Sequence, residues 1–247
     1  MISHEANLAG KRFTDNNLIM NLKKGKTEFV MYGTSQKLSR QPSCHIEIGG
    51  AEINQSSSYE YLGVTLDHHL TLQEQINKIY KKASSRLKLL QRIRPNISPH
   101  VAEKIYNVMI RPVLLYCYPV YISLGDTAKS KLQSIQDRAQ RIVARDNTIT
   151  LKWDSLEQTR KKRISIDVFK SVNGICMESL KNIFTKFDHG KNTRGNGSLL
   201  VLPKVRSESG RKTFAFQGAS IYNNLPSDVR NEKYFVNFKR KINTLCF

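Results

Sequence analysis

The sequence predicts an α+β fold that is mainly helical, and three patterns support this prediction. Residues 27–66 contain short apolar and alternating runs separated by glycine, which is typical of a small antiparallel sheet. From Leu72 onward, apolar residues recur every three or four positions, which indicates amphipathic helices. The last third of the chain combines further helical runs with many basic residues. We therefore expect a disordered start (1–12), a small β region (13–70), a helical bundle (71–150) and a basic, mainly helical C-terminal domain (151–247).

The β region is predicted from short segments bounded by turn residues. Residues 29–32 form a compact apolar run that stops at Gly33, as a buried strand would. Residues 45–48 and 51–53 flank Gly49-Gly50, and a glycine pair between two apolar runs favours a hairpin. Residues 59–66 are rich in aromatic and branched side chains and are a further strand candidate.

The bundle is predicted as three successive helices. In the first, Thr71 and Glu74 match a capping box and Pro95 ends the helix. The second begins at Ser98-Pro99, and the third covers about residues 127–145. The apolar face of the first helix comprises Leu72, Ile76, Ile79, Ala83, Leu87, Leu90 and Ile93, and its opposite face carries Lys78, Lys81, Lys82, Arg86, Lys88 and Arg92.

The charge of the chain is strongly and unevenly positive. Lysine and arginine total 40 against 20 acidic residues, and residues 1–70 are balanced, so the whole excess of +20 lies in the remainder. Such an excess predicts a polyanionic partner, for which nucleic acid is favoured over an anionic membrane or a merely solvated cationic surface. The longest apolar run, residues 113–122, contains Pro119 and is too short to span a bilayer. With no signal peptide recognised, we expect a soluble intracellular protein of the cytoplasm or nucleus.

The residues typical of a catalytic or metal site do not cluster in this sequence. Cys44, Cys117, Cys176 and Cys246 are far apart and form no C-x-x-C pair, so a zinc site is not predicted. The carboxylates are dispersed, whereas two-metal phosphoryl transfer requires them close together. No Walker loop, nucleophile elbow or G-x-G-x-x-G motif occurs. We expect no metal, no cofactor and no small-molecule substrate for this chain.

Several blocks nevertheless resemble, in order and spacing, one known family. NLKKGKTE (residues 21–28) followed by YEYLGVTLD (residues 59–67) is similar to the end of the reverse transcriptase domain of LINE-type non-LTR retrotransposons. The likeness covers about residue 13 to the end of the chain, and its further blocks are IYKKAS (79–84), RP (94–95), YN (106–107), RP (111–112), LQ (132–133), DRAQRI (137–142), NTRG (192–195), LP (202–203), FAFQGA (214–219) and NNLP (223–226).

The resemblance implies a role for particular segments. It implies that the β region is a remnant of the polymerase palm, that Lys26 lies near an incoming nucleotide, and that Tyr61, Leu62 and Gly63 form a primer grip. It also implies that the helical bundle is the thumb. In this family the catalytic aspartates precede the Lys-Thr element, whereas here Asp15 stands alone. We therefore expect no catalytic residue in these 247 residues, and Mg²⁺ only in a complete enzyme.

Nucleic-acid-binding residues are predicted from basic runs. Lys78, Lys82 and Arg86 recur at steps of four and can follow a row of phosphates. The alternative for each candidate is a solvated helix face, an ordinary core strand or, for Lys26, an exposed turn. The full set of nucleic-acid-binding candidates is Tyr61, Leu62, Gly63, Lys78, Lys81, Lys82, Arg86, Arg138, Arg141, Arg160, Lys161, Lys162 and Arg163.

The function predicted from these patterns is sequence-independent binding of an RNA or RNA–DNA duplex by a reverse transcriptase fragment that is inactive alone. One alternative is a subunit, or a truncated gene product, whose catalytic half of palm and fingers is supplied elsewhere and associates with it. The other is a decayed reading frame without activity.

Overall fold

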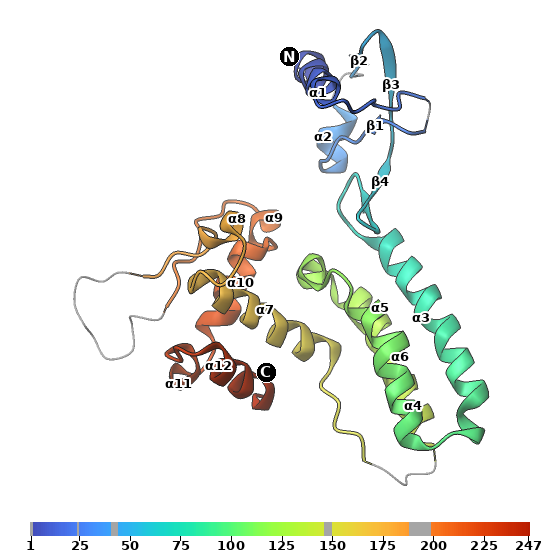
Figure 1. Cartoon of the computed structure of the whole chain (residues 1–247), viewed down its shortest axis with the longest axis vertical. Helices are drawn as coiled ribbons and strands as arrows, with labels where there is room; N and C mark the ends of the chain where they lie inside the picture. Colours follow the sequence, from blue (N-terminus) through green and yellow to red (C-terminus); the bar gives the residue numbers. More distant parts are fainter. Residues whose placement is uncertain (1, 24, 41–43, 146–149, 188–198) are drawn as a thin grey trace. The chain divides into compact units, whose positions relative to one another are not determined.

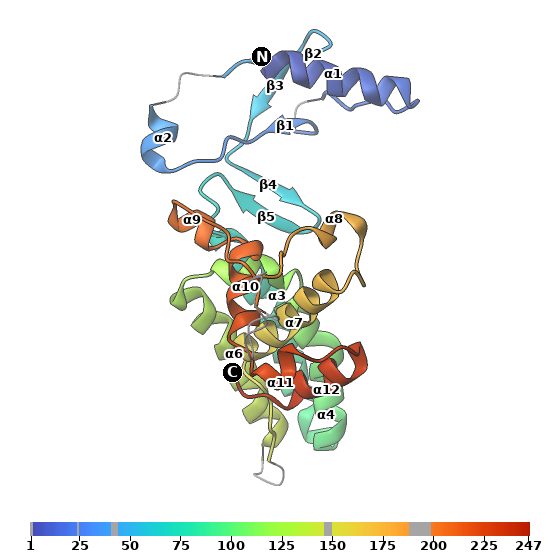
Figure 2. The same ribbon diagram turned by 90° about the vertical axis from the view of Figure 1, so that its left-hand side faces the viewer.

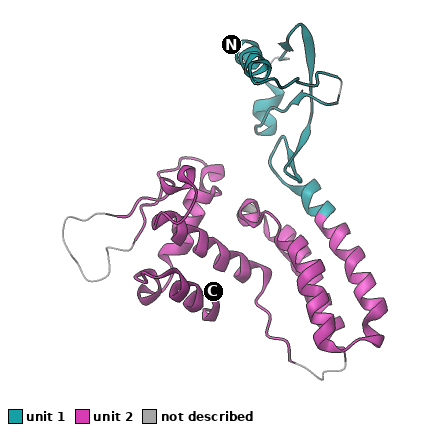
Figure 3. Ribbon diagram, in the orientation of Figure 1, with its two compact units in different colours: residues 1–78 teal, residues 79–247 magenta. Residues whose placement is uncertain are grey.

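The computed structural model describes residues 2–23, 25–40, 44–145, 150–187 and 199–247. The described chain forms two compact units, residues 1–78 (unit 1) and 79–247 (unit 2), shown in Figure 3. The predicted α+β, mainly helical class is confirmed, because both units contain helices and the strands are confined to unit 1 among the described elements. The finer domain boundaries stay predictions.

The described residues of unit 1 form two helices, five short strands and the first turns of a long helix (Figure 1). Strands β2 and β3 pair in antiparallel register with Ile46 opposite Ile53, as the Gly49-Gly50 pair predicted. A second antiparallel pair consists of β4 and β5. The elements are α1 (Ile2–Asp15), β1 (Glu28–Phe29), α2 (Ser35–Ser39), β2 (Ile46–Ile48), β3 (Ala51–Gln55), β4 (Ser58–Tyr61), β5 (Val64–Asp67) and the start of α3 (Gln73–Ile93).

Residues 2–15, for which a disordered start was predicted over 1–12, form helix α1 in the structure. Asn7 fixes this helix to the β2–β3 hairpin: its side-chain amide donates to the carbonyl of Glu47 (3.0 Å), and its Oδ1 accepts from the N–H of Gly49 (3.0 Å). These partners lie about 40 residues away along the chain, so local sequence patterns carry no sign of them.

The sheet also departs from the expected purely antiparallel arrangement. Strand β1 pairs with β3 in parallel, with Glu28 opposite Asn54, and it is only two residues long rather than covering residues 29–32. Beyond it the chain turns toward β5, where the N–H of Gly33 donates to the carbonyl of His68 (3.0 Å). The strand predicted at 59–66 is two strands, joined by a turn at Leu62-Gly63.

Helix α3 begins near the predicted residue, and Asp67 organises the turn before it. The Asp67 side chain accepts the N–H groups of Thr71 (3.0 Å) and Leu72 (2.7 Å), which precede the helix, and the Thr71 hydroxyl accepts the N–H of Gln73, its first residue (3.3 Å). Partial burial pushes the pKa of Asp67 upward, but the hydrogen bonds from Thr71, Leu72 and His69 outweigh it and lower this pKa. The predicted apolar face is buried from Leu72 to Leu90, and the α-helix ends at Ile93, where a 3-10 turn containing Pro95 begins.

Unit 2 consists of the rest of α3 and a succession of helices. The predicted second helix is interrupted by a π-helical turn, in which the N–H of Arg111 bonds to the carbonyl of Tyr106, five residues earlier. Pro112 follows and has no N–H to continue the α-helical pattern. The elements are η1 (Arg94–Asn96), α4 (Pro99–Ile105), η2 (Tyr106–Ile110), α5 (Arg111–Leu115), η3 (Tyr118–Ser123), α6 (Asp126–Ala144), α7 (Leu156–Val172), α8 (Glu178–Lys181), α9 (Glu208–Arg211), α10 (Phe214–Asn223), α11 (Ser227–Arg230) and α12 (Phe235–Thr244).

Two groups of contacts join these helices into one unit. The Tyr106 ring stacks on Trp153 with centroids 4.2 Å apart, and the Tyr106 hydroxyl donates to Gln136 of α6 (3.1 Å). Gln136 in turn donates to the carbonyl of Asp154, just before α7 (2.8 Å). Toward the C-terminus, Phe169 of α7 stacks on Phe238 of α12 with centroids 4.2 Å apart. No helix in the described part of the chain is both long and apolar enough to cross a membrane.

Candidate nucleic-acid interface

Helix α3 presents a run of exposed positive charge, as the sequence predicted. Between Ile79 and Ile93 it carries five basic residues and no acidic one. Lys81, Lys82 and Lys88 are exposed, as is Arg92. Because their apolar neighbours on the opposite face are buried, these four side chains are directed to solvent.

Two of the three residues predicted to follow a phosphate row have partners within the protein. Lys78 forms ion pairs with Glu60 and Glu74, both at 3.3 Å, and donates to the hydroxyl of Thr65 (2.7 Å). Desolvation opposes its charge, but the two carboxylates outweigh this effect and raise the pKa of Lys78. The Arg86 guanidinium donates to the carbonyl of Met109 on the π-helical turn. Lys82 is exposed, as is the paired Lys78, whereas Arg86 is half-buried.

Three exposed basic residues form a row along α3, and two of them were not among the predicted nucleic-acid-binding residues. Lys81, Lys88 and Arg92 are seven and four residues apart, so they project within about 40° of one another around the helix axis. This direction is opposite the buried Ala83 and Leu90. The sequence placed Lys88 and Arg92 on the face opposite the apolar one, but only Lys81 of these three was among the nucleic-acid-binding candidates. We call Lys81, Lys88 and Arg92 the α3 stripe.

The β4–β5 hairpin presents an exposed apolar tip. Leu62 is 73% exposed and has φ +48°, and Gly63 has φ +75°, which together form a two-residue turn. Positive φ is unfavourable for a leucine, so the tip holds a strained backbone and an exposed apolar side chain together. Tyr61 beside it is also exposed.

The hairpin is fixed to the first turns of α3. The buried Gln75 accepts the N–H of Thr65 (3.0 Å) and donates to the carbonyl of Gly63 (3.3 Å). Lys78 adds its bonds to Thr65 and Glu60 from the next turn. Gln75 and Lys78 therefore hold the tip in a defined position within unit 1.

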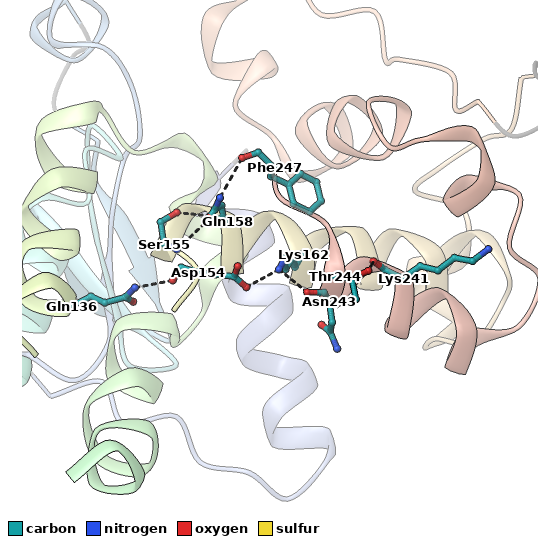
Figure 4. Close-up of polar contacts among 9 residues, drawn as sticks. All are labelled: Gln136, Asp154, Ser155, Gln158, Lys162, Lys241, Asn243, Thr244 and Phe247. Carbon is teal, nitrogen blue, oxygen red and sulfur yellow. Dashed lines mark hydrogen bonds and ion pairs between the residues drawn. The ribbon is translucent and has the colours of Figure 1, made fainter. Parts of the chain in front are cut away.

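Two of the four residues of the predicted Arg160–Arg163 nucleic-acid surface are buried in the structure. Lys162 is 7% exposed: its ammonium donates to Asp154 (2.7 Å) and to the carbonyl of Asn243 on α12 (2.9 Å), as Figure 4 shows. Arg160 is 5% exposed, donates to the carbonyl of Leu114 (3.3 Å) and lies over the Tyr121 ring. Burial lowers the pKa of Arg160.

The other two residues of that run are accessible to different degrees. Lys161 is half-buried and paired with Glu157 at 3.6 Å. Arg163 is exposed, and its guanidinium lies 5.5 Å from the centre of the Tyr118 ring. The run therefore spreads around α7, as consecutive helical residues must, rather than forming one basic face.

The remaining predicted residues are dispersed over the described chain. On α6, Arg138 is half-buried, and Arg141 is exposed with its Nε directed to the carbonyl of Asp137 (3.4 Å). Lys26 is exposed in a turn that Thr27 closes by donating to the carbonyl of Asn21 (2.8 Å). Lys24 and the NTRG block at 192–195 lie outside the described residues.

A cavity of about 500 Å³ is formed by residues on and around α7 and α8 of unit 2. Most of its lining is apolar, and Asp167 and Lys170 supply the charged groups. The Asp167 carboxylate already accepts a hydrogen bond from the Tyr118 hydroxyl. Among the described residues, no group of three or more His, Cys, Asp or Glu side chains is placed to hold a metal ion.

Comparison with known proteins gives two related matches. The chain is 32% identical over 102 residues to the RNA-directed DNA polymerase from mobile element jockey of Drosophila melanogaster, and 26% identical over 102 residues to that of Drosophila funebris. Each match covers 40% of this chain and 11% of the relative, so the match spans about a tenth of the length of these curated relatives. No family model matches the chain, and no solved structure matches it. Part of this chain is therefore related in sequence to the reverse transcriptase of a LINE-type retrotransposon.

Proposed function

We propose that this chain is a nucleic-acid-binding polypeptide derived from a retrotransposon reverse transcriptase, and that the α3 stripe binds the phosphates of an RNA or RNA–DNA duplex. The main observation in support is the exposed cationic face of α3, which has no acidic residue between Ile79 and Ile93. The sequence relationship to an RNA-directed DNA polymerase supports the same class of ligand.

The distribution of acidic residues in unit 2 adds to this support. Unit 2 has 32 basic and 12 acidic residues, whereas unit 1 has eight of each. Several acids of unit 2 pair with lysines away from α3, so they do not neutralise the α3 stripe. The pairs are Asp126–Lys129, Asp154–Lys162, Glu157–Lys161, Glu178–Lys181 and Glu232–Lys241.

The geometry of the α3 stripe favours contact with backbone rather than bases. Its three side chains extend over about 16 Å of helix, given a rise of 1.5 Å per residue. Long flexible cations in a row bind phosphates and do not distinguish bases. Such binding is weakened strongly by salt, because it releases counterions.

The hairpin tip is proposed as a second contact with nucleic acid. Tyr61 and Leu62 are exposed on a turn held by Gln75, and an exposed aromatic ring can stack on a base. The resemblance of residues 59–67 to a primer grip supports this role. The strained Leu62 is consistent with a residue selected for contact rather than for stability.

A binding titration tests the proposal. Fluorescence anisotropy would compare an RNA duplex, an RNA–DNA hybrid and a second duplex of unrelated sequence at one salt concentration. We expect similar affinities for duplexes of unrelated sequence. Absence of binding to any of these ligands at low salt would contradict the proposal.

A second candidate is a subunit of a working polymerase whose catalytic half is on another polypeptide. Its support is the relationship to an RNA-directed DNA polymerase. Under either candidate we propose that the chain alone extends no primer. Template-dependent extension by the purified chain with Mg²⁺, in a preparation cleared of contaminating polymerases, would contradict both.

A further inference from the structure

Helix α1 contacts the rest of unit 1 through its polar and small residues. Ser3 donates to the backbone of the segment leading into β2 (3.2 Å), and Asn7 makes two bonds of 3.0 Å to the backbone of the β2–β3 hairpin. Gly10 lies against the side chain of Ile48, where an added Cβ would be 3.1 Å from a methyl carbon. These three residues follow one side of the helix, and none of them is a large apolar residue.

The apolar side of α1 is left uncovered. Ile2, Ala6, Ala9 and Phe13 are spaced by four, three and four residues, so they project within about 60° of one another. Ile2 is 58% exposed, Phe13 is 44% exposed, and α1 contains no buried residue. Helix α1 packs beside β2, and Figure 2 shows it running on past this strand. An amphipathic helix normally buries this stripe, so an uncovered one indicates an interaction surface.

Two charged residues lie beside this apolar stripe, an acidic one toward its N-terminal end and a basic one toward its C-terminal end. Glu5 and Arg12 lie on the same flank, within about 20° of each other around the axis, and both are exposed. Unit 1 has equal numbers of acidic and basic residues, which favours neither a polyanion nor an anionic membrane as the partner.

We propose that α1 pairs in antiparallel fashion with α1 of a second copy of this chain. A twofold axis that passes between Ala6 and Ala9 would relate the two helices. It brings Ile2 of one copy against Phe13 of the other, and Ala6 against Ala9. The two small residues at the centre let the helices approach closely, while the large residues cover the ends. The same pairing brings Glu5 of each copy near Arg12 of the other, so the surface is complementary to itself.

The contact is small, since a single helix from each copy covers well under the roughly 800 Å² per partner of a standard interface. We therefore expect a weak dimer whose population depends on protein concentration. The proposal does not depend on nucleic-acid binding, because α1 belongs to the neutral unit.

Sedimentation equilibrium of the full chain across a micromolar to millimolar series tests this pairing. We expect Ile2→Glu with Phe13→Glu to abolish the dimer. We expect Glu5→Arg alone or Arg12→Glu alone to weaken it roughly tenfold, because two attractive pairs become repulsive. The double reversal Glu5→Arg with Arg12→Glu should restore it. Val236→Glu, an exposed apolar residue on α12, is the matched control and should change nothing.

Three outcomes would overturn the proposal: a chain that stays monomeric throughout, a dimer that survives the Ile2 and Phe13 changes, or a double reversal as weak as the single ones. Because all the changed side chains are exposed, circular dichroism should show an unaltered fold in every variant.

Discussion

The carboxylate of Asp67 accepts the backbone N–H of Leu72 at 2.7 Å, and this bond links the end of strand β5 to the start of helix α3. The N–H groups of Thr71 and His69 donate to the same carboxylate. One acidic side chain therefore holds the turn that leads into the long helix.

Replacing Asp67 by Ala should destabilise unit 1 by about 1 kcal/mol at neutral pH, because the N–H groups of His69, Thr71 and Leu72 lose their charged acceptor. The pKa of Asp67 is lowered in the folded state, so its contribution is present above the unfolded value near 3.8 and is lost as pH falls through the folded value. Urea unfolding at neutral pH and at pH about 2 would measure this. A difference between wild type and variant that is equally large at both pH values would contradict the role of the carboxylate. Asp15→Ala, at an exposed carboxylate, is the control.

Leu62→Asn should stabilise the β4–β5 hairpin by roughly 0.5–1 kcal/mol, because Asn-Gly is the dipeptide favoured in a turn with two positive φ values. The same change should weaken nucleic-acid binding if the leucine tip contacts the ligand. Hydrogen exchange of the hairpin amides and an anisotropy titration would measure the two effects. A variant that is more stable and binds equally well would remove the tip from the proposed interface.

Lys162→Ala should destabilise unit 2 by about 2 kcal/mol, because it leaves Asp154 and the carbonyl of Asn243 without the ammonium that both contact. Arg163→Ala, next to it but exposed, should change stability by less than about 1 kcal/mol. Thermal unfolding of the two variants makes the comparison. Equal losses of stability in the two variants would contradict the prediction that the buried Lys162 contributes more to stability than the exposed Arg163.

Gly218→Ala should destabilise the C-terminal core by about 1–3 kcal/mol, because an added Cβ would lie 2.8 Å from the Phe184 ring. Shortening the neighbour by Phe184→Leu should be less harmful in the Gly218→Ala background than in the wild type. A double-mutant cycle by chemical unfolding gives the coupling between the two positions. Additive effects would exclude the steric explanation.

The elements predicted correctly from the sequence are those that local patterns determine. The β2–β3 hairpin follows from Gly49-Gly50, and α3 follows from an apolar period sustained over about six turns. Helix α1 was missed because Asn7 and the distant hairpin hold it, and the role of Asp67 was missed because this residue lies outside the helical pattern.

The candidate site was predicted less well, because composition does not show which cations are buried. Lys162 is enclosed through contacts with Asp154 and with Asn243, which is 81 residues away. Lys78 is paired through Glu60 on a strand that precedes the helix. The exposure of Lys88 and Arg92, by contrast, can be predicted from the sequence alone, because both lie opposite the apolar face of α3.

The most direct test of the proposed function is the salt dependence of duplex binding by wild type and two variants. The first variant changes the α3 stripe, Lys81, Lys88 and Arg92, to Ala. The second removes the same net charge from exposed positions near the C-terminus, Lys233, Lys239 and Arg240. If each residue of the stripe neutralises a phosphate, the first variant should flatten the log–log slope of affinity against salt by roughly two to three units. The second should leave the slope close to that of the wild type. A folded stripe variant with an unchanged slope, or equal flattening in both variants, would contradict the assignment of α3 as the nucleic-acid-binding face.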